Sequence, residues 1–558
     1  MIDFGHRPVA LTIDGVVLCL YFFGIVGLGL WAGRKNRNLT DFALGGRSIP
    51  WWAVLASIIA AETSAATFLG TPAEGFKTRS FIYGQLAIGT VIARVIIAFT
   101  FIRPYYRYGV QSIYEFLEIR FGPRTRNLAS GLFLFTRVLA IGVRLYLGGA
   151  IIKVVWEYLF PGTPVDIRIY FWGILFVTVL TTVYTAIGGI KAVVWTDMIQ
   201  AVLMISSVLL AIVLIITHIP GEWTTVGKTL GGVPAFFQTG LDFSHGFWPG
   251  ISAMFAEPYT LAAAFFASTF ATMSTHGTDQ DMVQRMLTAS DFKKSRLSLI
   301  LSGLADLPIA ASFLLVGILL SVFYQINSQL SVPQSDNEIF AHFIVTQMPV
   351  GLRGLIVAGV FATMMGSTSA ALNALATSFT KDFFVPYLAR NRAPEALIWA
   401  ARLATLVFGA LMVVIATLTA HNVLEDSKLT ILPIALGSVG YTYGALLGVF
   451  LLGMLTKTRG NDRSNVFAML ISIALVLVVA RAKIPMIDLT ILLTQRRLLL
   501  TDWNVGGWLP VGFPEIAWPW WYFIGCAICF LVSSVFQTPA VRLEKAKEHL
   551  RNVPAIRQ

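Results

Sequence analysis

The sequence predicts an all-α protein that crosses a lipid bilayer many times, with two helices interrupted at membrane depth. Of its 558 residues, 56% are hydrophobic and only 13% are charged, and the mean hydropathy is +0.73. Apolar runs of roughly 20 residues recur along the chain, a length that suits helices, whereas the strands of a membrane barrel need only about 10 residues each. Short polar stretches, 60–64 and 272–277, interrupt two of these runs at corresponding places in the two halves of the chain.

We expect about thirteen spanning helices. They fall near residues 10–33, 46–71, 80–104, 125–157, 168–187, 190–217, 251–277, 295–324, 353–383, 395–420, 428–456, 464–482 and 517–537. The second to sixth spans and the seventh to eleventh spans form two sets of five. Because five is an odd number, the two sets insert in opposite orientations, which produces an inverted repeat. The sequence therefore predicts a five-plus-five core whose halves each begin with a broken helix.

The same pattern divides the chain into predicted segments. These are an extra N-terminal helix at 1–45, a first repeat at 46–218, an outer loop at 219–250, a second repeat at 251–457, two peripheral helices at 458–538 with an outer loop at 483–516, and a tail at 539–558. No segment outside the spans is long enough to form a soluble domain with its own core.

Positive charge predicts the orientation. The formal net charge is +12, and Lys and Arg gather in alternate connections and in the tail. Basic loops stay in the cytoplasm, so we expect an outside N-terminus, a cytoplasmic C-terminus and a place in the plasma membrane, which is the inner membrane in a bacterium. The basic residues are dispersed, which argues against nucleic acid as a partner. We expect the lipid bilayer and a small polar solute as partners, and function as a monomer.

The interrupted runs point to transport. Backbone that leaves a helix inside the bilayer must line a cavity or a bound ion, because lipid cannot satisfy its freed N–H and C=O groups. Paired interruptions in matching halves are typical of a transporter's binding site. A G-x-x-x-x-G-K-[ST] motif is absent from the sequence, which argues against an ATP-driven pump. HExxH and GxSxG sites at a suitable depth are also absent, so we expect no enzyme activity.

Four motifs resemble one family. They are LGTPAEGF (69–76), YTAIGGIKAVVWTDMIQ (184–200), GTDQDMVQR (277–285) and GSTSAALNALATSFTKD (366–382). In their order and spacing the chain is similar to the sodium:solute symporter family, also called solute carrier family 5, over roughly residues 10–456. The resemblance implies a LeuT-like fold of the amino-acid-transporter type, and sodium-coupled symport into the cell by alternating access.

Sodium is a hard cation that takes oxygen ligands, and a broken helix facing hydroxyl groups supplies them. Thr363 and Ser367 lie four residues apart on one face of the ninth span. The resemblance implies a sodium site made by these side chains and the carbonyls of Ala60 and Thr63, with Gly366 where many members have a serine. The alternative is that the hydroxyls only bond the carbonyls of their own helix.

Whether a second sodium ion binds is left open by the sequence. Acids inside a membrane are costly and usually functional. The resemblance implies that Asp197 and Ser369 would hold this ion, although Ala370 stands where a further ligand is expected. Alternatively, Asp197 caps or pairs near the inner face.

Polar side chains of three spans are expected to converge on the solute. These are Glu62, Ser64, Thr67, Gln85, Thr272, Thr275 and His276, and Phe81, one turn from Gln85, is expected to cover the site. A polar solute needs such groups in an otherwise apolar pocket. Asp306 stands near the place where sugar-transporting relatives carry a lysine, and the segment 431–444 lacks their glutamine, so both weaken a simple sugar assignment. A monocarboxylate, an amino acid, a sugar, a sugar acid and a polyol all remain open.

Charged residues inside the spans are expected to couple ion and solute. We assign gating or coupling roles to Asp279, Arg285 and Asp306. A helix cap by Thr278 or Asp279 would explain part of the same pattern equally well. The roles of Arg94, Arg137 and Arg144 stay open between meeting a solute carboxylate, snorkelling, and pairing with Glu62 or Asp197.

Two other functions fit part of the pattern. Glu62 in apolar surroundings is a physically sound titrating group for proton-coupled uptake. A membrane sensor built on a transporter scaffold is the other candidate; because no signalling domain follows Thr538, we do not expect it.

Overall fold

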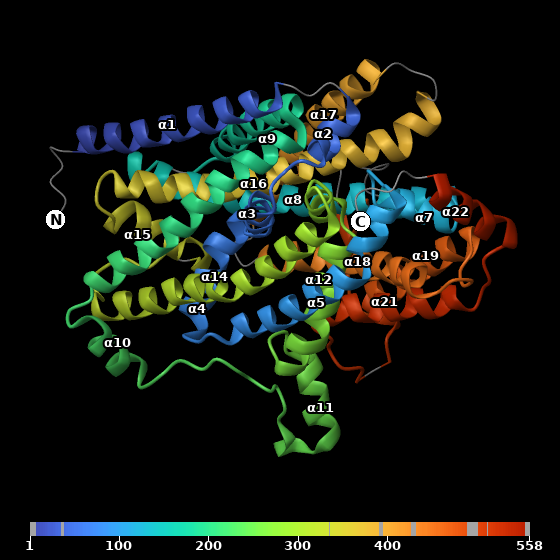
Figure 1. Ribbon diagram of the computed structural model, residues 1–558. Helices are drawn as coiled ribbons and strands as arrows, with labels where there is room; N and C mark the ends of the chain where they lie inside the picture. The colour runs from blue at the N-terminus through green and yellow to red at the C-terminus, as the bar shows by residue number, and fades with distance from the viewer. Residues whose placement is uncertain are drawn as a thin grey trace, which may run out of the picture.

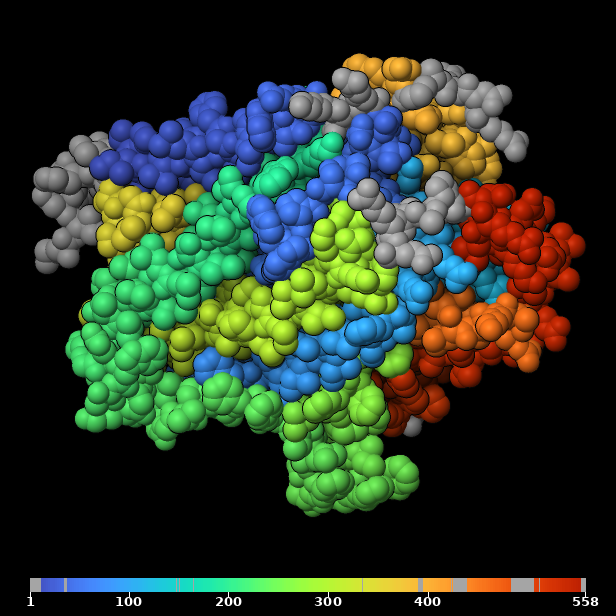
Figure 2. All heavy atoms as spheres, in the orientation of Figure 1, coloured from blue at the N-terminus to red at the C-terminus, as the bar shows by residue number. Residues whose placement is uncertain are grey.

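A computed structural model describes residues 7–34, 38–163, 165–333, 335–389, 394–425, 431–487, 500–510 and 512–552. Long helices lie side by side in one bundle, and helix α11 projects from its side (Figure 1). The space-filling view shows the same projection as a stalk beside an otherwise closely packed body (Figure 2).

The first half of the chain is helical throughout its apolar runs. It contains α1 (Arg7–Gly33), α2 (Leu39–Leu44), η2 (Gly45–Arg47), α3 (Trp51–Glu62), η3 (Ala66–Gly70), α4 (Thr71–Thr78), η4 (Ile82–Gln85), α5 (Leu86–Thr100), α6 (Ile102–Tyr108), α7 (Tyr114–Arg120), α8 (Pro123–Leu159) and α9 (Ile167–Thr217). The connection that follows contains α10 (Glu222–Leu230), η5 (Phe243–His245) and α11 (Phe247–Ala256).

The second half repeats this pattern. It contains η6 (Ala263–Ala267), α12 (Ser268–Gly277), α13 (Gln280–Met286), α14 (Phe292–Ile326), η7 (Asp336–Glu338), α15 (Ile339–Gln347), α16 (Leu352–Ser378), η8 (Phe379–Leu388), α17 (Pro394–Glu425) and α18 (Ile431–Leu455). The last part contains α19 (Asp462–Val479), β1 (Lys483–Ile487), β2 (Leu500–Asn504), η9 (Val505–Trp508), α21 (Trp518–Ser534) and α22 (Ala540–Asn552).

Within the described part of the chain, apolar helices lie in all the predicted spans except 251–277. Among the described residues, eight helices are long and apolar enough to cross a membrane, and the bent pair of α3 with the helix that follows it makes a ninth. Shorter apolar helices, Val439–Leu455 and Trp518–Ser534, lie in two further predicted spans. Helix α9 is kinked at Gly189, with φ at 54°, between the spans predicted at 168–187 and 190–217. The total of thirteen stays a prediction.

The first interruption lies where the sequence predicts it. Helix α3 ends at Glu62 because Thr63 has extended backbone angles, with φ at −79° and ψ at 95°. The two arms of the broken helix, Trp51–Glu62 and Ala66–Thr78, meet at an angle of 62°. The last carbonyls of α3 are therefore without the hydrogen bonds of a continuing helix.

The second interruption lies later than predicted. Residues 272–277 are helical, and the backbone leaves the helix at Thr278 and Asp279. The prediction was wrong there because Ser274, Thr275 and Thr278 donate their hydroxyl hydrogens to carbonyls of the preceding turn, which lets the polar stretch stay helical. Asp279 then caps α13, accepting a hydrogen bond from the backbone N–H of Asp281 at 2.8 Å.

Two further expectations about the elements need correction. The predicted span 251–277 is not one helix, because α11 ends at Ala256 and Pro258 lacks the N–H that a continuing helix needs. The predicted outer loop 483–516 contains an antiparallel hairpin, in which Lys483 pairs with Asn504 and Ile487 with Leu500. The described fold is otherwise helical.

Glycine allows the second arm of the broken helix to lie directly against α14. A Cβ atom on Gly317 would lie 1.9 Å from the carbonyl oxygen of Pro72 in α4, and one on Gly75 would lie 2.4 Å from that of Leu314. These neighbours are backbone atoms, so no side-chain rotation relieves the clash. The site described below therefore rests on a fixed contact between α4 and α14.

Gly317→Ala should lower thermal stability, because the added methyl group separates α4 from α14 at a cost of about 1–3 kcal/mol. Thermal unfolding of the purified protein in detergent measures the effect. Gly131→Ala is the matched control, since Gly131 lies inside α8 with open space around it and should gain up to about 1 kcal/mol of helix propensity. An equal melting temperature for the two variants would contradict the proposed contact.

Candidate functional site

A cavity of about 240 Å³ lies beside the break in the first half. Its walls come from the broken helix and from α5, α8, α12, α14 and α21. Of the residues predicted to bind solute or to couple it, the cavity is lined by Glu62, Ser64, Thr67, Thr272, Thr275, His276 and Asp306. Thr63, predicted as a sodium ligand through its carbonyl, also lines it.

Phe81 and Gln85 lie outside this lining. The Gln85 amide donates to the carbonyl of Tyr259 at 2.6 Å, and its oxygen accepts from the backbone N–H of Gln238 at 3.3 Å. Phe81 stacks on Phe236 with ring centroids 4.7 Å apart. Both side chains therefore hold the connection after α9 against the bundle.

Glu62 is held by an ion pair. Arg94, which is completely buried, pairs with the Glu62 carboxylate and donates to Ser302 Oγ at 2.7 Å. His276 Nε2 lies 3.6 Å from the carboxylate and 3.3 Å from the Arg94 guanidinium. Of the alternatives for Arg94, the structure favours pairing with Glu62. The carboxylate still faces the cavity, with 26% of its side chain exposed.

Two charged side chains face the cavity without a partner among the described residues. Arg144 of α8 and Asp306 of α14 line the cavity, and neither makes a hydrogen bond or an ion pair with another described residue. Thr272 and Thr90, which also line the cavity, share a hydrogen bond at 3.2 Å. Within the part of the chain that the structure describes, the cavity thus offers one unpaired cation, one unpaired acid and several hydroxyl groups to a solute.

The cavity has a wall that the sequence analysis assigned to the periphery. Trp518 and Tyr522 of α21 line it, together with Tyr83 and Thr90. Although 458–538 is predicted to be peripheral to the core, α21 packs against α18 and α12 and so reaches the cavity. These residues are far from the broken helix in the sequence, so no local sequence pattern indicated that they would lie beside it.

A second set of oxygen atoms surrounds Gly366 of α16. A Cβ atom on Gly366 would lie 3.4 Å from the carbonyl oxygen of Ala60, 3.0 Å from Gln200 Oε1 and 3.7 Å from Asp197 Oδ1. The missing side chain leaves room between these oxygens. The structure therefore brings the predicted residues Ala60, Gly366 and Asp197 together at one point.

The hydroxyl groups of α16 keep their lone pairs available. Thr363 donates to the carbonyl of Val360 at 2.8 Å, and Ser367 donates to that of Thr363 at 2.9 Å. Ser369 donates to the carbonyl of Gly366 at 3.0 Å. These hydroxyls do bond carbonyls of their own helix, and each oxygen can still accept a cation while its hydrogen is engaged.

Gln200 is a residue that the sequence analysis missed. Both polar atoms of its amide and Asp197 Oδ1 are buried and have no hydrogen-bond partner among the described residues. Buried polar atoms without partners are costly and call for a ligand. The signal was present in the sequence, because Gln200 lies three residues after Asp197 and so on the same face of α9.

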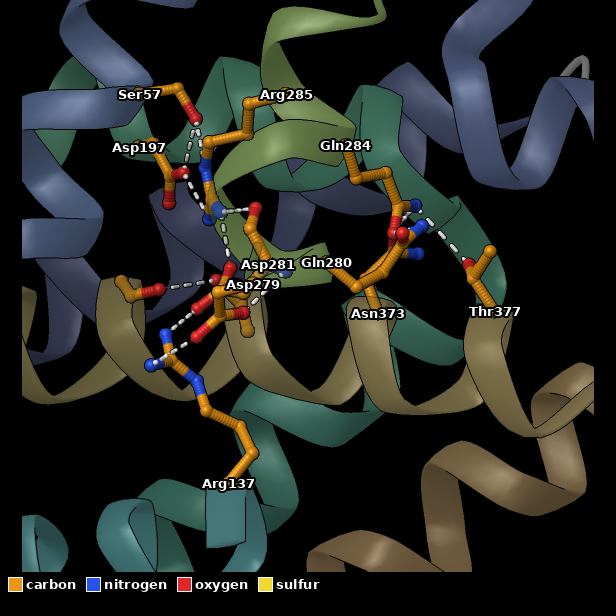
Figure 3. Close-up of polar contacts among 12 residues, drawn as sticks. Ser57, Arg137, Asp197, Asp279, Gln280, Asp281, Gln284, Arg285, Asn373 and Thr377 are labelled. Atoms are coloured by element: carbon orange, nitrogen blue, oxygen red, sulfur yellow. Dashed lines mark hydrogen bonds and ion pairs between the residues drawn. The ribbon is translucent and has the colours of Figure 1, made fainter. Parts of the chain in front are cut away.

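Arg285 connects Asp197 to the residues after the second interruption (Figure 3). Its Nη2 lies 3.3 Å from Asp197 Oδ2, which also accepts from Ser57 Oγ at 2.6 Å. Arg285 Nε donates to the same Ser57 hydroxyl at 2.8 Å, and Nη1 pairs with the carboxylate of Asp281.

Arg137 continues this connection to the cavity. It pairs with Asp281 through one guanidinium nitrogen, and the other lies 3.0 Å from Asp279 Oδ2 (Figure 3). The hydroxyl of Tyr443 donates to the same Asp279 oxygen at 2.8 Å. Arg137 also lines the cavity. We call Asp197, Arg285, Asp281, Arg137 and Asp279 the ion-pair chain. The predicted coupling residues Asp279 and Arg285 both belong to it, while Asp306 lies in the cavity wall.

A many-spanning helical protein with a broken helix, a small polar cavity beside it and an oxygen cluster against the break is an ion-coupled secondary transporter. The model of the sodium:solute symporter family matches residues 42–472. The chain belongs to the sodium:solute symporter family.

Known proteins agree with this assignment. The sodium/sialic acid symporter SiaT of Proteus mirabilis is 28% identical over 85% of this chain and 90% of its own length. The human sodium/iodide cotransporter is 29% identical over 81% of this chain and 67% of its own length. A solved structure of a substrate-bound, outward-open sodium-coupled sialic acid symporter superposes with a TM-score of 0.74 at 24% identity, covering 94% of this chain and 97% of that one.

The family and the fold establish the general function. The protein is a multi-pass membrane transporter with an inverted-repeat, LeuT-like fold, and it is not an enzyme. It couples the movement of a small solute to sodium.

Proposed function

We propose that the protein imports a small solute bearing a carboxylate group, and that a sugar acid of the sialic acid class is the first candidate. The supporting observation is Arg144, a guanidinium in the cavity wall with no ion pair or hydrogen bond among the described residues. A cation inside a membrane is costly unless it is paired, so a carboxylate on the solute would complete the site.

The rest of the cavity suits hydroxyl and amide groups. Asp306 accepts hydrogen bonds, and Thr272 and Thr275 both donate and accept them. A neutral sugar would leave the charge of Arg144 uncompensated. Two of the relatives are named for sialic acid and iodide, which are both anions at neutral pH, and a third is named for glucose, a neutral sugar. Iodide alone would leave the hydrogen-bonding groups unused, which favours the larger acid.

Sodium would bind against the break in the first half. The proposed ligands are the carbonyls of Ala60 and Thr63 and the hydroxyls of Thr363 and Ser367, with Gln200 Oε1 supplying an oxygen beside Gly366. Supporting this, the Gln200 oxygen and the Ala60 carbonyl both lie near the space over Gly366. A second sodium ion would use Asp197 Oδ1 together with Ser369.

The proposed cycle is alternating access. Sodium binds from outside and holds α3 against α16, which forms the solute site. The solute then binds, one bundle rocks against the other, and low internal sodium releases both. The membrane potential adds about 2.3 kcal/mol per charge for each 100 mV. We propose further that the N-terminus is outside and the C-terminus cytoplasmic, that the membrane is the plasma or bacterial inner membrane, and that the monomer is the working unit.

Proton coupling through Glu62 is a weaker explanation, because Arg94 pairs with that carboxylate. Uptake of labelled sialic acid into liposomes holding the purified protein tests the proposal. We expect accumulation with an inward sodium gradient and background uptake when choline replaces sodium. Equal uptake in choline would overturn sodium coupling. Sodium-driven uptake of a labelled monocarboxylate or amino acid, with only background uptake of sialic acid, would overturn the sugar-acid assignment.

Arg144→Gln should weaken binding of the acid by about 10- to 100-fold, since it removes a charge-assisted contact of roughly 1.5–3 kcal/mol. Binding is measured by calorimetry in saturating sodium. Arg168→Gln is a matched control, because Arg168 is an exposed arginine paired with Asp166 away from the cavity. Unchanged affinity in Arg144→Gln would contradict the proposed carboxylate contact.

A further inference from the structure

The ion-pair chain joins the proposed sodium cluster to the solute cavity. Asp197 stands at one end, with Oδ1 beside Gly366, and Arg137 stands near the other end, in the cavity wall. Arg285 and Asp281 lie between them, and all side chains of the chain are at most 4% exposed. The view in Figure 3 shows the two arginines on opposite sides of the Asp279 and Asp281 carboxylates.

The ion-pair chain has one positive charge fewer than it has negative charges. It contains three carboxylates but only two guanidinium groups. The shortage falls on Asp197, whose Oδ1 has no partner among the described residues and whose Oδ2 meets Arg285 only at 3.3 Å. A buried carboxylate that is incompletely paired attracts a cation strongly, because the surroundings do not screen it.

Each guanidinium in the chain is shared between two carboxylates. Arg285 contacts both Asp197 and Asp281, and Arg137 contacts both Asp281 and Asp279. A group shared in this way binds one partner more firmly when the other partner is neutralised. A change of charge at Asp197 therefore alters the contacts of Arg137.

We propose that the ion-pair chain transmits sodium binding to the solute cavity, an inference that rests on the proposed function. Sodium at Asp197 displaces Arg285 from that carboxylate, and Arg285 then pairs with Asp281 alone. Asp281 in turn binds Arg137 less tightly. The Arg137 guanidinium is then free to interact more strongly with an anionic solute bound beside Arg144. Arg285, Asp281 and Arg137 are positioning residues in this scheme.

The reverse direction follows by thermodynamic linkage. An anionic solute that draws Arg137 away from Asp281 strengthens the pairing of Arg285 with Asp281 and so frees Asp197 for sodium. Ion and solute therefore raise each other's affinity by the same factor. Arg353 is a buried arginine that pairs with Asp14 at 2.5 Å and does not belong to the ion-pair chain. It therefore serves as a control for substitution of a buried arginine.

The first experiment uses sodium alone. Half-saturating sodium is measured from thermal stabilisation of the purified protein, with choline keeping the ionic strength constant. Arg285→Gln removes the competitor and should lower half-saturating sodium about five- to tenfold, whereas Asp281→Asn should raise it by a similar factor. General damage to the fold would not produce opposite signs. Shifts in the same direction, or no shift, would overturn the proposed competition.

The second experiment preserves charge and breaks the sharing. A lysine ammonium is a point charge that does not span two carboxylates as the guanidinium fork does. In the unaltered protein we expect sodium to raise sialic acid affinity at least fivefold. The quantity compared is the sialic acid affinity in sodium divided by that in choline. In Arg285→Lys and Arg137→Lys this affinity ratio should fall to within about twofold of one, while Arg353→Lys should keep the ratio of the unaltered protein. These variants also serve if Arg285→Gln does not fold.

The outcomes separate this inference from the proposed function. If the unaltered protein binds no acid in sodium, or binds it equally in choline, the proposed function fails and the sodium-only experiment decides the competition. If the unaltered protein shows the sodium effect and both lysine variants keep it in full, the proposed function stands and the ion-pair chain does not transmit it.

Discussion

Replacing both Thr363 and Ser367 with alanine abolishes sodium-dependent uptake in our expectation. The two hydroxyls are the side-chain ligands proposed for sodium on α16, and each bond to a charged partner contributes about 1.5–3 kcal/mol. Losing both raises half-saturating sodium by at least about 100-fold, which takes it beyond ordinary external concentrations. Sodium titrations of liposome uptake measure the shift.

A matched control separates this effect from general loss of hydroxyl groups. Thr405 is also buried and donates to a carbonyl four residues earlier, at 2.9 Å, in α17. Thr405→Ala should leave half-saturating sodium unchanged. If Thr363→Ala/Ser367→Ala took up solute with the sodium dependence of the unaltered protein, the proposed ion site would be in the wrong place.

Arg94→Met should produce the largest loss of stability. Breaking a buried ion pair leaves an uncompensated charge and costs about 3–5 kcal/mol. We expect about 3 kcal/mol, because Glu62 keeps some contact with the cavity and with His276. Thermal unfolding in detergent checks the loss, with Gly131→Ala as a reference for a tolerated change inside a helix.

A second substitution tests the cause. Arg94→Met/Glu62→Gln removes the charge that the single variant leaves unpaired, so it should be more stable than Arg94→Met alone. Stabilities of the four proteins form a double-mutant cycle that isolates the pair. Additive effects of the two substitutions would show that the ion pair does not hold α5 to the broken helix.

Much of the fold was predictable because a membrane-spanning helix can be recognised from the hydropathy of its own residues. An apolar run of about 20 residues has few alternatives to a spanning helix, since lipid satisfies no backbone group. The break at Thr63 was predictable for the same reason, because a polar stretch interrupts such a run. The break near 272–277 was misplaced because hydroxyl side chains can bond their own helix, so a polar sequence alone does not show whether the helix continues.

The candidate site was predictable only in part. Glu62, Thr67, Thr272 and His276 line the cavity as predicted. They were predictable because the first two flank the break and the last two lie in the polar stretch of α12. Phe81 and Gln85 lie outside the lining of the cavity, since their side chains contact a connection whose path the sequence did not reveal. The positions proposed for sodium and solute await the binding measurements above.

By itself the sequence determined that this is a many-spanning helical membrane protein, broken at Thr63, with oxygen-bearing side chains concentrated on one apolar helix. Local hydropathy and motif spacing carry that information within windows of a few turns. Only the tertiary structure decided which charges meet: Arg94 with Glu62, Arg285 with both Asp197 and Asp281, and Arg144 with none among the described residues. These contacts join helices that are far apart in the sequence, and helix packing, not local pattern, sets their distances.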